Sequence, residues 1–200
     1  MAFLLTRRAA LTALAGTALL SACTIADDGK NTSSADTSSE GALSTVTQGK
    51  LTIATGEPAY SPWVEDNDPA SGKGFEAAVA YAVAGKLGFA NSDVVWVRTT
   101  FDAAVAPGAK DWDFNLQQFS ITEERKNAVD FSSPYYTSAQ AVVTLKSSPV
   151  ASATSIEALK GALLGAQTGT TSYKTLTEKV APTTTPAVFN SSQDTVQALK

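Results

Sequence analysis

From residue 51 onward, short apolar runs alternate with stretches of helical periodicity. Runs of β-branched residues at 51–55 and 94–97 predict strands, because both are bounded by turn-forming residues. A helix is predicted over 75–87, ended by Gly88, from an apolar stripe that repeats every four residues: Phe75, Val79, Val83 and Leu87. This strand–helix–strand alternation predicts an α/β lobe with parallel strands.

The same alternation continues to residue 200. Between the first strand and helix, 65–74 is predicted to be a hairpin or surface loop; its acidic and Asn residues lack the terminal Glu of a calcium-binding EF-hand. Further strands are expected at 112–119, 141–145, 162–166 and 188–189. Further helices are expected at 100–106, from 155 to 160, at 172–180 and from 192 to 200.

The stretch 112–136 combines a strand with unusual polarity. A strand buried on both faces should be nearly all apolar, yet this one carries three amides, which suggests that it ends at a polar cavity: Asn115, Gln117 and Gln118. Thr122 is a good N-cap for the helix that follows. Arg125 is unfavourable in a first helical turn, so either neighbouring glutamates compensate it on the surface or it binds an anion together with free N–H groups.

A second strand, turn and helix start occurs at 162–180. Gln167 and the hydroxyl-rich residues after it precede the helix, so this is a second candidate anion-binding helix terminus. The alternative is ordinary N-capping by Thr171 or Ser172.

Two segments, SITEER at 120–125 and VDFSSPYY at 129–136, together resemble the family 3 extracellular solute-binding proteins, the amino-acid receptors of bacterial ABC importers. The resemblance extends over residues 48–200. It implies a periplasmic-binding-protein-like type II fold, with two α/β lobes joined by a hinge. It also implies that Arg125 and Ser120 bind the α-carboxylate of an amino acid.

The resemblance assigns further residues to ligand binding. The loop 57–63 would lie over the ligand, with Tyr60 and Trp63 against its side chain and Glu57 near a cationic group. Trp63 has the alternative of being a core residue, as large aromatics usually are. The remaining expected contacts follow strand ends: Phe101, Gln118, Gln167 and Thr171.

Residues 1–22 are expected to be a signal peptide. Arg7 and Arg8 precede an apolar run that is too short to span a bilayer comfortably. The run ends in a sequence that resembles a bacterial lipobox, LSAC at 20–23, which implies cleavage before Cys23 and lipid attachment to it. The alternative to the lipobox is an ordinary secretory signal with an incidental cysteine. The export pathway is also open, and is either the Sec or the twin-arginine pathway.

Residues 23–49 are rich in Ser, Thr, Asp and Gly and are expected to form a flexible tether. The tether would hold the folded part at the outer face of the cytoplasmic membrane. Lobe one is expected at 50–142, the hinge crossover at 143–147 and a partial lobe two at 148–200.

Composition excludes several classes of function. The net charge is −4, and losing Arg7 and Arg8 with the signal peptide would make it −6, so nucleic acid is not an expected partner. The chain has no histidine, and Cys23 is its only cysteine, which leaves no evident metal cluster and no Ser-His or Cys-His nucleophile. Neither a metal nor a cofactor is therefore expected.

The resemblance implies capture of a polar amino acid for an ABC permease by hinge closure, without covalent chemistry, and a monomer when complete. One alternative is an enzyme on the same fold, like the cyclohexadienyl dehydratases, for which Glu57 is the only evident general acid. A signalling sensor module is a third alternative. In the family, a strand after the A-L-K of 198–200 supplies an acidic ligand for the α-ammonium group, so we expect the second lobe to be incomplete. The alternatives are a fragment and a functional short form.

Overall fold

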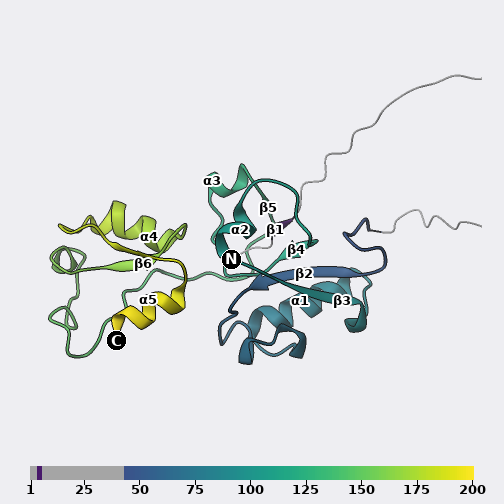
Figure 1. Ribbon diagram of the computed structural model, residues 1–200, viewed down its shortest axis with the longest axis horizontal. Coiled ribbons are helices and arrows are strands. Elements are labelled where there is room, and N and C mark those ends of the chain that lie inside the picture. Colours follow the sequence, from purple (N-terminus) through teal and green to yellow (C-terminus); the bar gives the residue numbers. More distant parts are fainter. Residues whose placement is uncertain (1–3, 6–42) are drawn as a thin grey trace, which may run out of the picture.

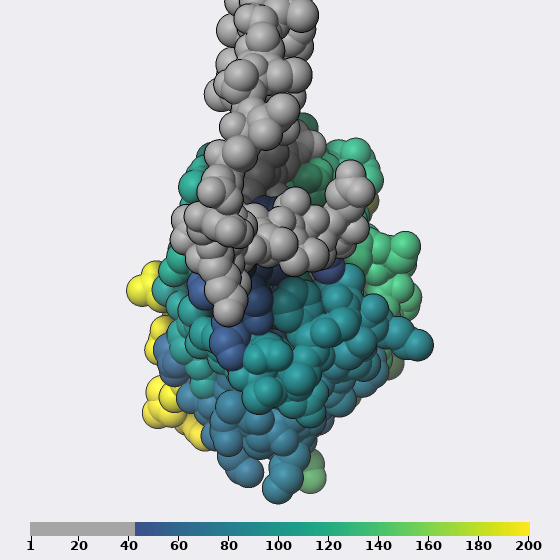
Figure 2. Space-filling model, turned by 90° about the vertical axis from the view of Figure 1, so that its right-hand side faces the viewer, coloured from purple at the N-terminus to yellow at the C-terminus, as the bar shows by residue number. Residues whose placement is uncertain are grey.

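The computed structural model describes residues 4–5 and 43–200. Cys23, most of the predicted signal peptide and most of the predicted tether lie outside the described residues. Figure 1 shows two lobes side by side, joined by one extended segment. Figure 2 looks along the long axis from the lobe-one end, where residues of lobe one form most of the visible face and lobe two shows at its margin.

Lobe one is built on a five-stranded sheet with the order β3-β2-β4-β1-β5. Its strands are β1 (Leu4–Leu5), β2 (Leu51–Gly56), β3 (Val94–Thr99), β4 (Phe114–Asn115) and β5 (Asp130–Phe131). β2 pairs in parallel with β3 and β4, which confirms the predicted parallel arrangement. β1 lies antiparallel between β4 and β5, so two residues of the predicted signal peptide complete this sheet.

Both faces of β2 are buried, as expected for a central parallel strand. Successive side chains point to opposite faces. Leu51 and Ile53 pack with helix α1 (Phe75–Lys86) on one face. Ala54 packs with Ala104 of helix α2 (Phe101–Val105) on the other. The sheet is therefore the middle layer of lobe one.

Helix α1 is present where predicted, and the middle of its predicted apolar stripe, Val79 and Val83, packs against the core around β2. Phe75 and Leu87 at the two ends of that stripe are 42% and 43% exposed. The fully buried apolar residues of the helix are alanines instead: Ala77, Ala80 and Ala84. Small side chains let the helix lie close against the sheet. Because alanines occur all around this helix, the apolar pattern of the sequence does not show which face is buried.

The strand expected at 112–119 is shorter than predicted, since β4 covers only Phe114–Asn115. Gln118 adopts a φ of 51°, which an extended strand cannot include. Helix α3 (Glu123–Lys126) then begins after Thr122, whose hydroxyl accepts a hydrogen bond from the Arg125 backbone N–H and confirms the predicted N-cap. The 65–74 loop forms two 3-10 turns rather than a hairpin (η1, Glu65–Asn67; η2, Pro69–Ser71), and a third precedes β3 (η3, Asn91–Asp93).

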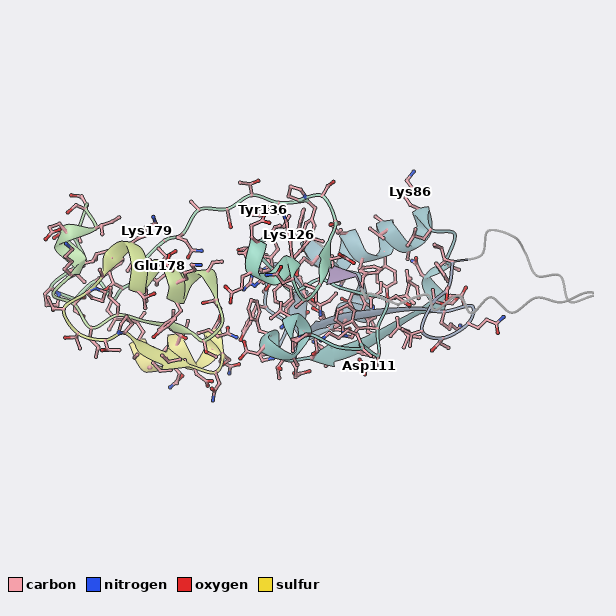
Figure 3. The ribbon with its side chains drawn as sticks, turned by 90° about the horizontal axis from the view of Figure 1, so that it is seen from above. Lys86, Asp111, Lys126, Tyr136, Glu178 and Lys179 are labelled. Carbon is pink, nitrogen blue, oxygen red and sulfur yellow. The ribbon has the colours of Figure 1, made fainter. Side chains whose placement is uncertain are left out.

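The segment that leaves lobe one is not the predicted strand. Residues 136–145 have no helix or strand, and Val143 is 76% exposed. Since no neighbouring strand of the described chain pairs with 141–145, its apolar sequence alone does not make it a strand. Figure 3 shows this segment arching from Tyr136 towards lobe two.

Lobe two contains a two-stranded parallel sheet, β6 (Gly165–Gln167) and β7 (Ala187–Phe189). Helix α4 (Thr171–Thr175), continued by a π-helical turn (η5, Leu176–Val180), and helix α5 (Ser192–Leu199) pack on it. The helix expected from 155 is only a 3-10 turn (η4, Glu157–Leu159). The core of this lobe is small: Leu164, Ala166, Leu176 and Val180.

Contact with the sheet begins before residue 50. The backbone N–H groups of Val46 and Thr52 each donate to the Asp113 carboxylate at 2.7 Å. The end of the predicted tether is thus attached to lobe one. Across the described chain, helices are too short or too polar to span a bilayer, and acidic side chains do not gather into a group that could hold a metal ion.

Candidate binding site between the lobes

A cavity of about 350 Å³ lies between the two lobes. This volume is within the range of small-molecule sites, about 300–1,000 Å³. The cavity brings together eight of the nine predicted ligand-binding residues: Glu57, Tyr60, Phe101, Gln118, Ser120, Arg125, Gln167 and Thr171. They follow β2, β3, β4 and β6, at the carboxyl ends of the strands where parallel sheets place their ligand sites.

Arg125 is held deep in this site. The residue is only 9% exposed, and its guanidinium carbon lies 5.2 Å from the centroid of the Phe101 ring and 5.5 Å from that of Phe119. Both distances allow cation–π attraction. Burial lowers the pKa of Arg125 from its ordinary value, although Glu124 and Asp102 favour the charged form. The guanidinium remains charged at neutral pH, because arginine side chains do not lose their proton in proteins.

The hydrogen-bond partners of the Arg125 guanidinium are carbonyl groups. One Nη atom donates to the Ser120 carbonyl at 2.8 Å and the other to the Gly169 carbonyl at 2.9 Å. Among residues 43–200, no carboxylate pairs with Arg125, and Glu123 pairs with Lys126 instead at 2.7 Å. Glu124 and Asp102 thus favour the charge of Arg125 only through space, without an ion pair among the described residues. The Arg125 side chain also lines the cavity.

Both lobes contribute hydroxyl groups near Arg125. Ser120 Oγ of lobe one lies 3.3 Å from Thr171 Oγ1 of lobe two. Gln140 Nε2 also donates to Thr171 Oγ1 at 3.3 Å. The helix bearing Thr171 is capped by Thr170, whose hydroxyl accepts from the Tyr173 backbone N–H, so the alternative of N-capping by Thr171 or Ser172 is wrong. Thr171 is thereby left to face the cavity.

Gln118 lines the cavity, and the buried Glu76 carboxylate on its other side holds it in place. Its backbone N–H donates to the Glu76 carboxylate at 2.9 Å, and its side-chain amide donates to the same carboxylate. Tyr135 adds a third bond to Glu76 at 2.5 Å. Glu76 is 1% exposed, so this carboxylate is a buried support for the wall that Gln118 forms.

Glu57 and Tyr60 lie on the loop after β2. The Glu57 carboxylate is 3.5 Å from Arg98 Nε and accepts a hydrogen bond from Asn67 Nδ2 at 3.4 Å. Its side chain is 54% exposed, so it remains accessible to a further cation. The Tyr60 hydroxyl accepts from the Gln193 backbone N–H of lobe two at 3.3 Å.

Trp63 is the predicted ligand contact that the cavity does not include. Its ring packs edge-on against Phe75 at 5.8 Å and Tyr136 at 5.0 Å between centroids. Trp63 is half-buried and belongs to none of the core clusters of the described chain, so it lies in this group of aromatic rings rather than in the core.

A third helix start, that of α5, lies at the cavity and was not predicted as part of the site. Ser191 caps α5 by accepting from the Asp194 backbone N–H at 3.0 Å, and Ser192 Oγ donates to Gln167 Oε1 at 2.9 Å. Both serines line the cavity. The sequence pattern could have predicted it, because the order of strand, polar residues and helix start found after β4 and β6 recurs after β7. Gln140 was missed because it lies outside any such pattern.

Comparison with known proteins places these features in one family. The model of the bacterial extracellular solute-binding proteins, family 3, matches residues 51–200. A probable histidine-binding protein of Campylobacter jejuni is 32% identical over 143 residues, covering 70% of this chain and 52% of the relative. The histidine-binding periplasmic protein of Escherichia coli K12 is 27% identical over 141 residues, with the same coverage of 70% and 52%. This chain thus spans about half the length of these relatives.

Solved structures agree on the fold. An ancestral amino acid-binding protein, a precursor of cyclohexadienyl dehydratase, superposes with a TM-score of 0.61 at 27% identity, covering 76% of this chain and 66% of that one. A Salmonella typhimurium periplasmic binding protein with high arginine specificity gives a TM-score of 0.59 at 25% identity, covering 75% and 64%. The expected α/β periplasmic-binding-protein type II fold is confirmed. The chain belongs to the family 3 bacterial extracellular solute-binding proteins.

Proposed function

We propose that this protein captures a polar amino acid outside the cytoplasm and presents it, by closure of the two lobes, to an ABC permease. The buried guanidinium of Arg125 carries this proposal. Burial disfavours the charge of Arg125, and Glu124 and Asp102 offset this only through space, so an arriving carboxylate that pairs with the guanidinium would reduce the remaining cost. The guanidinium has five N–H donors, and two of its hydrogen bonds go to the Ser120 and Gly169 carbonyls, which leaves donors for a ligand.

Contributions from both lobes support closure as the mechanism. Ser120 and Arg125 belong to lobe one, while Thr171 and the α5 start belong to lobe two, and all line the same cavity. A ligand held by both sets of groups binds the closed arrangement better than an open one, so it shifts the population towards closure. The permease would then distinguish the closed form from the open one.

The cavity favours a ligand with polar or cationic groups. Glu57 is the only carboxylate among the cavity-lining residues, and Arg125 is the only cation. This pair of opposite charges suits a zwitterion or a ligand with a basic side chain. The names of the relatives agree with this class, since two are histidine-binding and one has high arginine specificity.

An enzymatic role on this fold is supported less well. A dehydratase needs a general acid at the reacting group. Glu57, the only carboxylate lining the cavity, already contacts Arg98 and Asn67. Glu76 lies behind Gln118 and is not among the lining residues. We therefore propose a receptor that performs no covalent chemistry. From the lipobox-like sequence, we also propose that lipid on Cys23 anchors it at the outer face of the cytoplasmic membrane.

The test is calorimetric titration of the protein and of Arg125 variants with a panel of amino acids. Arg125→Ala should weaken binding by about a hundredfold to a few thousandfold, because breaking a buried charged pair costs about 3–5 kcal/mol. Arg125→Lys should keep a small part of the affinity, since lysine cannot form the two parallel bonds.

Lys126→Ala is the matched control, because Lys126 is the adjacent cation but its exposed side chain pairs with Glu123. It should bind like the wild type. Near-normal affinity of Arg125→Ala would remove Arg125 from the site. Wild-type protein that binds no amino acid, or that turns over a prephenate-like acid, would overturn the proposed function.

A further inference from the structure

Arg98 places a positive charge beside Glu57, the only carboxylate among the residues that line the cavity. Arg98 lies near the end of β3, where the strand register aligns it with Thr55 of β2. Its Nη1 atom donates to the Gly56 carbonyl at 2.6 Å, and its Nη2 atom donates to the Asn67 carbonyl. Since both acceptors are backbone atoms, the guanidinium is held next to the peptide group that precedes Glu57.

Both oxygens of the Glu57 carboxylate have a partner within lobe one. Oε2 lies 3.5 Å from Arg98 Nε, and Oε1 accepts from Asn67 Nδ2 at 3.4 Å. These contacts are longer than ordinary hydrogen bonds of about 2.7–3.2 Å, and the Glu57 side chain is 54% exposed, so a ligand can reach it. Arg98 still offsets part of the negative charge when the carboxylate turns, because backbone carbonyls hold the guanidinium in place.

A ligand with a basic side chain therefore finds no free counter-charge among the residues that line the cavity. An amino acid already brings one ammonium group, and a basic side chain brings a second cation. Together with Arg98, the single carboxylate of Glu57 would then have to offset three positive charges. Taking a cation out of water without compensation is unfavourable. An uncharged polar side chain avoids this penalty and can hydrogen-bond to lining amides such as Gln117 and Asn190.

We propose that Arg98 is a specificity-determining residue, which directs this site towards amino acids with an uncharged polar side chain and away from those with a basic one. Arg98 is not itself among the lining residues, so it is a positioning residue that acts through the carboxylate of Glu57 and through its own charge. This inference rests on the proposed function and narrows its ligand class.

Arginine and citrulline are suitable probes, because the two have nearly the same shape and citrulline carries an uncharged ureido group in place of the guanidinium. Calorimetric titration of the full chain at low ionic strength gives the ratio of the two Kd values. The wild type should bind citrulline at least as tightly as arginine. Arg98→Gln should shift the ratio in favour of arginine by about two- to fivefold, the effect expected of a partly exposed ion pair. Added salt should reduce this shift.

Two control variants separate charge from structure. Arg98→Lys keeps the charge but loses the paired donors, so both affinities should fall while their ratio stays near the wild-type value. Damage to the loop alone would likewise weaken both probes together. Lys50→Gln is the matched control for net charge, because Lys50 pairs with Asp93 at 2.8 Å just before β2 and β3 begin, at the far end of both strands from Glu57. It should leave the ratio unchanged.

Adding Glu57→Gln to Arg98→Gln should remove the gain for arginine. If the gain persists in the double variant, or if Arg98→Gln keeps the wild-type ratio, Arg98 does not set specificity through Glu57. A wild type that binds arginine more tightly than citrulline would also overturn the inference, while leaving the proposed function in place. A wild type that binds no amino acid would overturn the proposed function, and this inference with it.

Discussion

Replacing Glu76 with alanine should destabilise lobe one and disturb the cavity wall together. The Gln118 backbone N–H cannot turn to another acceptor, and a buried donor left unpaired costs about 1–3 kcal/mol. Removing the buried methylene adds about 0.8 kcal/mol. We therefore expect the free energy of unfolding of lobe one to fall by about 2–4 kcal/mol in urea denaturation.

Glu76→Gln should lower the free energy of unfolding less than Glu76→Ala does, by about 1 kcal/mol. The Gln118 side-chain amide can rotate by half a turn, so that it either donates to or accepts from the amide introduced at position 76. Affinity should fall more in the alanine variant, since Gln118 loses the bond that supports its φ of 51°. Tyr135→Phe is the control: it removes one bond to Glu76 and leaves those to Gln118. A loss of less than about 0.5 kcal/mol in Glu76→Ala would refute the reasoning, because it is within the range of an ordinary surface substitution.

The pH dependence gives an independent check. Burial raises the pKa of Glu76 above its ordinary value of 4.5, against the opposing effect of its bonds from Tyr135 and Gln118. Between the two pKa values, the folded protein keeps a proton on Glu76 that the unfolded chain has lost. The stability contributed by protonated Glu76 is therefore fully present below pH 4.5 and is lost as pH rises through the raised pKa of the folded protein. The cost of Glu76→Gln should therefore be largest below pH 4.5 and shrink towards neutral pH.

Two further predictions concern Cys23 and Asn115. Cys23→Ser should no longer partition into detergent with the membrane fraction, and a wild type found wholly in the aqueous phase would contradict the lipid anchor. Asn115 is fully buried, and its Oδ1 has no hydrogen-bond partner among the described residues. Asn115→Leu should leave the free energy of unfolding unchanged or raise it by about 1 kcal/mol in urea denaturation, because it removes an unpaired polar atom; a clear loss would reveal a partner for that atom.

The sequence predicted the elements whose pattern is local. β2, β3 and the Thr122 cap follow from apolar runs and one hydroxyl, and the residues after β2, β3 and β4 were expected to meet because parallel strands of one sheet end at one edge. Gln167 and Thr171, which come from the second sheet's side of the cavity, were expected there from the family resemblance. The predictions failed where a distant partner decides the conformation. Gln118 leaves the strand because Glu76, far away in the chain, binds its backbone.

The predictions for the buried face of α1 and for a strand at 141–145 failed for a related reason. The buried face of α1 depends on how closely the sheet approaches, which a run of Ala and Val does not encode by periodicity. The 141–145 segment has strand-like composition, but a strand needs a neighbour, and the composition of one segment does not supply one. The Gly169 carbonyl gave no signal in the sequence, because it enters the site only by accepting a hydrogen bond from Arg125 of the other lobe.

The apolar cores of the two lobes are separate. One set of buried residues surrounds β2, and the cluster around Leu164 and Leu176 shares no member with it. Cooperativity in unfolding comes from shared burial, so polar contacts across the cavity and one extended segment couple the lobes only weakly. Heating should consequently melt the smaller core before the larger one, and a single midpoint fitted to such a curve would be an average of two transitions rather than a property of either lobe.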